Sequence, residues 1–229
     1  MLKFFKRDLK CEADCWRKKR PNFCQTEKES LYLMKKFIQS WIEKFWQIPK
    51  KPRILEIGGG GRPIVNFFEN VEKYTLDPLM DFYQGKFPDF YQDQALIKIK
   101  SEAEEMPFKD NFFDLILMLN ALDHTENPKK VLGQCYRVLK SGGIMAISVD
   151  TYLWFWKIFR KTSPLFGHKF YLCHPQTFTN RDVKKLISEI GLKILHSFVE
   201  DEPKFDSRKL RMLTKLKYNI HRLYVLAQK

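Results

Sequence analysis

A glycine-rich turn between two apolar runs constrains this chain more than any other feature. Residues 54–57 read Ile-Leu-Glu-Ile and are followed at once by four glycines, 58–61. Glycines let the backbone turn sharply and approach a ligand closely. A second apolar run ends at Asp77, where a carboxylate can accept hydrogen bonds from both hydroxyls of a ribose. The segment predicts a strand, a turn, a helix and a second strand that together bind an adenosine-containing ligand.

The residues around the turn favour one such ligand. A nicotinamide dinucleotide site uses G-x-G-x-x-G, and here Gly58 and Gly60 fill the first two glycine positions while Pro63 occupies the third. Glu56 would repel a pyrophosphate but would attract a cationic amino-acid ligand, directly or through water. S-adenosylmethionine carries a sulfonium and an ammonium and has no phosphate. The sequence therefore favours S-adenosylmethionine over a dinucleotide.

Several segments in the same order and spacing resemble the class I S-adenosylmethionine-dependent methyltransferases with a methyltransferase type 11 core. The resemblance is good over about residues 52–150 and looser to about 199. The segments that carry it are 54–60, the ribose-binding strand end 74–78, the run 101–114 (Ser-Glu-Ala-Glu-Glu-Met-Pro-Phe-Lys-Asp-Asn-Phe-Phe-Asp), 115–120, His124 and 138–143.

The alternation of apolar runs with helical patterns predicts a mostly parallel sheet covered on both faces. The resemblance implies a Rossmann-like, seven-stranded methyltransferase sheet, with the last strand antiparallel between the fifth and sixth. The expected strands are 53–57, 72–76, 95–100, 113–119, 144–149, 192–199 and 218–227. The expected helices are one of about 20 residues that starts at Thr26 and ends before Pro49, then 62–69, 128–139 and 180–190. Residues 78–94 have no clear pattern.

The resemblance also assigns the cofactor-binding residues. Glu56 is expected to orient the methionine end of the cofactor, and Asp77 to hold the ribose. Glu102 stands where the family usually has an Asp that contacts the adenine amino group. The full expected set is Glu56, Gly58, Gly59, Gly60, Asp77, Pro78, Glu102, Ala103, Asn120 and Ala121.

Methyl transfer is an in-line displacement at a sulfonium carbon, so the protein mainly aligns the nucleophile with the methyl group. A general base helps only when the nucleophile must lose a proton. His124 follows the expected fourth strand and is the candidate catalytic residue, because histidine accepts protons near neutral pH. The alternative is a hydrogen-bonded structural histidine.

Residues 150–178 are rich in aromatic side chains and follow the fifth strand, at the edge where open α/β sheets bind ligands. We interpret this segment as a cap over the substrate pocket. Its substrate candidates are Tyr152, Trp154, His168 and His174. The alternatives are an insertion that only packs on the sheet and a membrane-surface contact.

Charge and cysteine content bear on partners and location. The net charge is +14, and residues 1–26 carry eight Lys or Arg against three Asp or Glu. We therefore expect a basic arm over 1–26, a single domain over 27–229, and an anionic partner. Cys11, Cys15 and Cys24 have a spacing that fits no zinc or cluster motif, so we expect thiols and no metal. No apolar run reaches the length of a membrane span, and a cytoplasmic protein with weak contact at the inner membrane face is expected.

The sequence predicts an S-adenosylmethionine-dependent methyltransferase that acts on O, N or C of a small or medium-sized, anionic acceptor in envelope polysaccharide, lipid or quinone metabolism. One alternative is a nucleic-acid (RNA) methyltransferase, which the charge supports. Residues 120–123 read Asn-Ala-Leu-Asp, however, and not the Asn/Asp-Pro-Pro-Tyr of amino-group methylases. The other is a non-catalytic, methyltransferase-like binding protein, in which degraded cofactor motifs would be expected.

Overall fold

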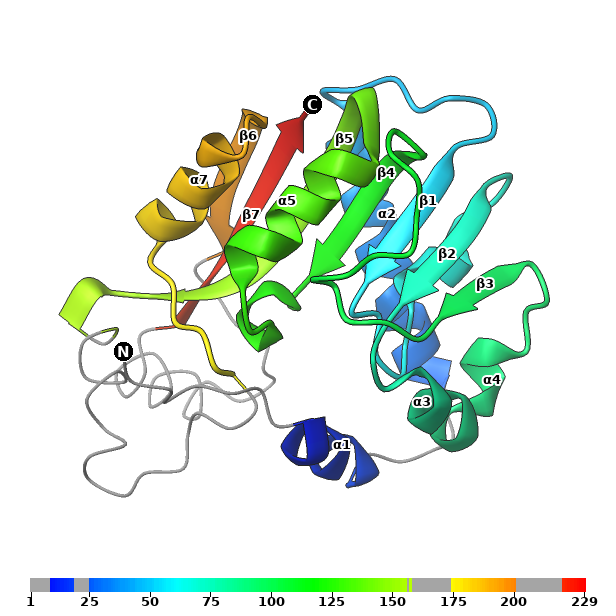
Figure 1. The fold of residues 1–229 in the computed structure, drawn as a ribbon. Helices are drawn as coiled ribbons and strands as arrows, with labels where there is room; N and C mark the ends of the chain where they lie inside the picture. Colours follow the sequence, from blue (N-terminus) through cyan, green and yellow to red (C-terminus); the bar gives the residue numbers. More distant parts are fainter. Residues whose placement is uncertain (1–8, 19–24, 156, 158–173, 201–219) are drawn as a thin grey trace.

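The computed structural model describes residues 9–18, 25–155, 157, 174–200 and 220–229. Its centre is a seven-stranded sheet of order β3-β2-β1-β4-β5-β7-β6 (Figure 1). The strands are β1 (Arg53–Ile57), β2 (Glu72–Leu76), β3 (Leu96–Ile99), β4 (Phe113–Leu119), β5 (Leu139–Tyr152), β6 (Lys193–Glu200) and β7 (Ile220–Gln228). The last strand, β7, is antiparallel to β5 and β6, and the other pairs are parallel. The predicted fold class is confirmed.

Helices cover both faces of this sheet (Figure 1). On one face, α5 (Pro128–Val138) and α7 (Asn180–Glu189) pack on alternate strand residues such as Ile116 and Ile147. On the other face, α2 (Gln25–Glu43) packs on intervening residues such as Leu115 and Ala146. Because successive strand residues point to opposite faces, one apolar strand serves both cores.

Local sequence signals fix the helix ends on the first face. The Thr179 side chain accepts a hydrogen bond from the Asp182 backbone amide, and the Asp182 carboxylate accepts one from the Thr179 amide, so α7 begins with a capping box. For α5, the Asn127 side chain is the cap and Pro128 occupies the first helical position. These signals place the loops at the carboxyl ends of β4 and β5.

Three predicted elements differ in the structure. The helix expected at 62–69 is only the 3₁₀ turn η1 (Ile64–Phe67), because Phe68 is already extended and Asn70 has a positive φ before β2. The fifth strand is much longer than 144–149, since β7 pairs with β5 as far as Tyr152. The helix α2 begins at Gln25, one residue before the expected start at Thr26.

Short helices fill two regions that have no predicted element. Residues 78–94 contain α3 (Met80–Lys86) and α4 (Pro88–Tyr91). In the expected basic arm, α1 (Leu9–Arg17) lies beyond the carboxyl ends of the parallel strands (Figure 1). In the described part of the chain, every helix is too short or too polar to cross a bilayer.

Candidate functional site

A cavity of about 380 Å³ lies at the carboxyl ends of β1, β2 and β4. Open α/β sheets bind ligands at this edge, and the volume is that of a small-molecule site. Most of the residues predicted from sequence line this cavity: Glu56, Gly58, Gly59, Gly60, Asp77, Pro78, Ala103, Asn120, Ala121, His124 and His174. The fold thus brings together residues from five separate stretches of the sequence.

The glycine turn forms one wall of the cavity, and two of its positions require glycine. Gly58 has φ +71° and Gly60 has φ +56°, a region that side-chain-bearing residues rarely adopt. A Cβ atom on Gly58 would lie 2.5 Å from the Cβ of Ala121, and one on Gly60 would lie 2.9 Å from Cζ2 of Trp16. The turn can therefore pack against both neighbours only because these residues have no side chain.

Asp77 follows β2 directly and is only 2% exposed. One carboxylate oxygen, Oδ1, accepts a hydrogen bond of 2.9 Å from the backbone amide of Leu79. This bond orients the carboxylate at the start of the loop that leads to α3. The side chain lines the cavity together with Pro78, at the position expected for a ribose contact.

Glu56 is buried at the carboxyl end of β1, and its carboxylate contacts the start of η1. The two carboxylate oxygens accept hydrogen bonds from the backbone amides of Ile64 (3.1 Å) and Val65 (2.8 Å). Burial raises the pKa of Glu56 to about 7, although both backbone hydrogen bonds lower it; the charge of Asp77 adds to the rise. The side chain therefore anchors η1, and its expected role toward the methionine end of a cofactor remains a prediction.

The structure does not gather all of the predicted residues. Glu102 is not among the residues that line the cavity, although its neighbour Ala103 is. Tyr152 lies at the end of β5 outside the lining, and its amide donates to the carbonyl of Phe178. Trp154 is 69% exposed. His168 and most of the expected cap, residue 156 and residues 158–173, lie outside the described residues.

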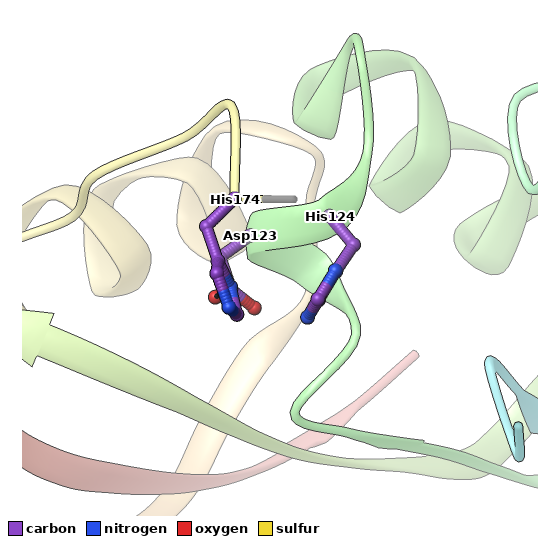
Figure 2. A group of neighbouring side chains, drawn as sticks. All are labelled: Asp123, His124 and His174. Carbon is purple, nitrogen blue, oxygen red and sulfur yellow. Dashed lines mark hydrogen bonds and ion pairs between the residues drawn. The ribbon is translucent and has the colours of Figure 1, made fainter. Parts of the chain in front are cut away.

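Two histidines that line the cavity lie beside a buried aspartate (Figure 2). Asp123 and His124 belong to the 3₁₀ turn η2 (Leu122–His124), whereas His174 comes from the chain that leads to α7. The His174 Nδ1 and Asp123 Oδ2 atoms are 2.7 Å apart, and the two imidazole centroids are 4.2 Å apart. Burial would raise the pKa of Asp123, but the hydrogen bond with His174 and the charges of both histidines outweigh it and lower the pKa.

Sequence reasoning missed the contribution of α1 and α2 to the cavity. Glu12, Cys15 and Trp16 of α1 line it, as do Leu31 and Met34 of α2. The ring of Trp16 packs edge-on against Tyr83 and Phe87, with centroids 5.4 and 5.5 Å away. The spacing of Leu9, Ala13 and Trp16 on one helix face was the available signal, hidden by the surrounding basic residues.

The three cysteines that the structure describes differ in whether they form a disulfide. Cys11 is disulfide-bonded, whereas Cys15 and Cys135 are thiols. The expectation of a thiol at Cys11 is therefore wrong. Burial raises the pKa of the Cys135 thiol to about 12, so this side chain acts as a packing residue of the core.

Residues 55–147 match a family described as a methyltransferase domain, and they contain the glycine turn, Asp77 and His124. The chain carries a class I S-adenosylmethionine-dependent methyltransferase domain. The sheet order and the antiparallel β7 agree with this assignment. The methyltransferase domain thus accounts for the cavity, since its cofactor edge is the edge at which the cavity lies.

Curated proteins with similar sequences match only part of this chain, and solved structures with low sequence identity share its fold. The ubiquinone/menaquinone biosynthesis C-methyltransferase UbiE of Psychromonas ingrahamii is 29% identical over 108 residues, 44% of this chain and 43% of that protein. The chain matches less than half the length of the curated relatives. The phosphoethanolamine N-methyltransferase 2 of Haemonchus contortus, in complex with phosphomonomethylethanolamine and S-adenosylhomocysteine, is 14% identical with a TM-score of 0.60, over 85% of this chain and 52% of that one.

The same fold also occurs in a protein named for another reaction. The [4+2]-cyclase SpnF is 13% identical with a TM-score of 0.63, over 84% of this chain and 80% of that one. The fold alone therefore does not specify the reaction, and the function must be argued from the residues of the cavity.

Proposed function

We propose that this protein transfers a methyl group from S-adenosylmethionine to a small or medium-sized acceptor. The observation that carries the proposal is the single cavity in which Gly58, Asp77 and Asn120 meet at the carboxyl ends of three parallel strands. This edge provides a backbone wall without side chains, a buried carboxylate for a ribose and a polar strand end. The matched methyltransferase domain spans the same three residues.

Each wall of the cavity receives a part of the cofactor in this proposal. Asp77 holds the ribose hydroxyls, and Ala103 lies along the adenine edge. Asn120 and Ala121 present backbone to the methionine moiety. Glu56 supplies negative charge near the cationic end, which favours a sulfonium and an ammonium over a phosphate. Glu102 is half-buried beside Ala103 and would contact the adenine amino group from the rim of the cavity.

The transfer itself requires alignment more than chemical activation. The acceptor atom attacks the methyl carbon in line with the departing sulfur, and the cavity holds the two at short range. When the acceptor must lose a proton, His124 and His174 are the candidate bases, because both line the cavity. The Asp123–His174 contact fixes the orientation of one imidazole, as a carboxylate does in other histidine bases.

The net charge, the aromatic residues and the similarity to one relative indicate what kind of acceptor the protein uses. The net charge of +14 favours an anionic acceptor, and the aromatic residues near Tyr152 and Trp154 favour a partly apolar one. The similarity to a quinone C-methyltransferase is consistent with such a molecule, as are lipid and envelope-polysaccharide precursors.

Calorimetry with S-adenosylmethionine and S-adenosylhomocysteine tests the proposal. We expect micromolar binding by the wild type and a loss of about tenfold or more in Asp77→Ala, because a hydrogen bond to a charged group contributes roughly 1.5–3 kcal/mol. Asp81→Ala is the matched control, since Asp81 is an exposed carboxylate on α3 that does not line the cavity. A wild type that binds neither ligand would contradict the proposal.

A nucleic-acid methyltransferase remains the second candidate because of the positive charge. Binding to RNA that weakens steeply with salt, together with incorporation of labelled methyl groups into RNA, would favour it. Incorporation into a small-molecule fraction alone would favour the first candidate.

A further inference from the structure

We propose that Asp123, His124 and His174 bind one divalent transition-metal ion at the end of the cofactor cavity. The site is built from two places in the chain, since η2 supplies two of the residues and the segment before α7 supplies the third (Figure 2). Each residue offers one ligand atom, and these atoms all lie within 4.8 Å of one another. Neighbouring ligand atoms of a four-coordinate ion with bonds of about 2.1 Å are about 3.4 Å apart, so side-chain movements of roughly 1 Å would close the site.

The state of Asp123 is a second, independent observation. This aspartate is 4% exposed, and within the described residues its Oδ1 atom has no hydrogen-bond partner. A buried carboxylate oxygen without a partner is costly, and such a group calls for an unseen ion or water. Its other oxygen, Oδ2, lies 2.7 Å from Nδ1 of His174, a hydrogen-bond distance, so an ion bound by both groups would replace this hydrogen bond.

The charge around the group also fits a divalent cation. Glu12 of α1 brings a second carboxylate, with its Oε2 atom 4.0 Å from Nδ1 of His124. Asp123 and Glu12 together carry the two negative charges that would neutralise such an ion. Both carboxylates are largely shielded from solvent, where the attraction is screened least.

The donor atoms select the kind of metal. Two imidazole nitrogens and one carboxylate suit Mn²⁺, Fe²⁺, Co²⁺ or Zn²⁺, whereas Mg²⁺ and Ca²⁺ prefer oxygen ligands throughout. Three protein ligands leave coordination positions open, which is the arrangement of a reactive site and not of a closed structural one. His124 and His174 line the cavity, so these open positions would face the bound ligands.

The site deepens the proposed function, on which this step rests. The acceptor would be a hydroxyl compound, and the ion would take the place of a histidine base, because both imidazoles would be its ligands. An acceptor oxygen bound to the ion loses its proton to water more readily, since a metal lowers the pKa of a bound hydroxyl. The oxygen then forms its bond to the methyl carbon while the carbon–sulfur bond breaks and leaves its electron pair on sulfur. The products are a methyl ether and the neutral thioether of the cofactor.

Metal titration tests the site without relying on turnover. The full chain, purified without a histidine tag and treated with a chelator, is titrated with Co²⁺, Mn²⁺ and Mg²⁺ by calorimetry, and Co²⁺ binding is followed by visible absorption. We expect one Co²⁺ or Mn²⁺ per chain and at least tenfold weaker binding of Mg²⁺. In His174→Gln and Asp123→Asn, Co²⁺ affinity should fall at least tenfold.

His196→Gln is the matched control and should leave Co²⁺ affinity unchanged. His196 lies on β6, accepts a hydrogen bond from Trp41 of α2 and does not line the cavity. Circular dichroism and S-adenosylhomocysteine binding show whether each variant is folded. Wild-type protein that binds the cofactor product but no Co²⁺ or Mn²⁺ would overturn the metal site alone. Equal Co²⁺ affinity of the wild type and a folded His174→Gln variant would also overturn it.

Two further results distinguish metal binding from cofactor binding and from a role of the metal toward the acceptor. Metal binding without cofactor binding would contradict the proposed function and leave the metal site standing. Azide, added to the Co²⁺ form, should change its visible spectrum because the ion has exchangeable positions. An unchanged spectrum would mean a saturated site and would overturn the role toward an acceptor.

Discussion

Single residues that line this cavity both stabilise the fold and are positioned to contact a ligand. Glu56 shows the conflict most clearly, because its buried carboxylate secures η1 through the amides of Ile64 and Val65. Sequence reasoning placed Glu56 at the cavity, since a carboxylate two residues before the glycine turn has a distinctive position. It could not assign the partners of that carboxylate, because they depend on the length of the helix that follows the turn.

The raised pKa of Glu56 predicts a dependence of stability on pH. The unfolded chain releases this proton near pH 4.5, whereas the folded protein holds it until about pH 7. The folded state binds more protons in this window, so the free energy of unfolding should fall as pH rises from 4.5 to 7 and level off above it. The contribution is roughly 3 kcal/mol.

Urea unfolding of Glu56→Gln between pH 4.5 and 8 checks this assignment. The variant has no proton to lose there, so the part of the fall due to Glu56 should disappear. Glu104→Gln is the control, because Glu104 is also buried and accepts backbone hydrogen bonds, yet the variant keeps Glu56. An unchanged profile in Glu56→Gln would show that another group causes the fall.

At the scale of elements, strongly patterned segments were predictable and weakly patterned ones were not. The bounds of β1, β2 and β4 agree with the prediction. The long apolar run of β4 marks a strand buried on both faces, and β1 and β2 are delimited by the glycine turn and by Asp77 that follow them. The start of α7 agrees because Thr179 and Asp182 form a complete capping box. By contrast, α1 has only nine residues among many basic ones, and its packing on the glycine turn is a tertiary effect.

Trp16 makes α1 part of the binding site in this structure, and its truncation should show this. Trp16→Ala removes an aromatic side chain that packs on Gly60, Tyr83 and Phe87, and so opens the cavity to solvent. We expect affinity for S-adenosylhomocysteine to fall about tenfold, in line with the loss of a partly buried apolar group. Calorimetry measures the change, with Trp154→Ala as a control at an exposed tryptophan outside the cavity. Equal affinity of Trp16→Ala and the wild type would exclude α1 from the site.

At the scale of the molecule, the cavity depends on elements that lie far apart in the sequence, from α1 to the segment that carries His174. The N-terminal α1 and α2, the strands β1, β2 and β4, and the segment that carries His174 all contribute to its lining. The sheet connects them, since β4 pairs with β5 and β5 with β7. A ligand in the cavity therefore stabilises the sheet and its covering helices together, and not one local segment.

Thermal unfolding measures this coupling directly. At a concentration of S-adenosylhomocysteine about 100 times its Kd, the folded state should gain about 2.7 kcal/mol. For a chain of this size, that gain corresponds to a rise in Tm of roughly 5–10 °C. The rise should fall to about half or less in Asp77→Ala, because a tenfold weaker Kd leaves only about 1.4 kcal/mol of stabilisation at the same ligand concentration. It should persist in full in Asp81→Ala, because only Asp77 lines the cavity. An equal rise in Asp77→Ala would mean that the ligand binds elsewhere, since stabilisation by mass action requires an intact site on the folded protein.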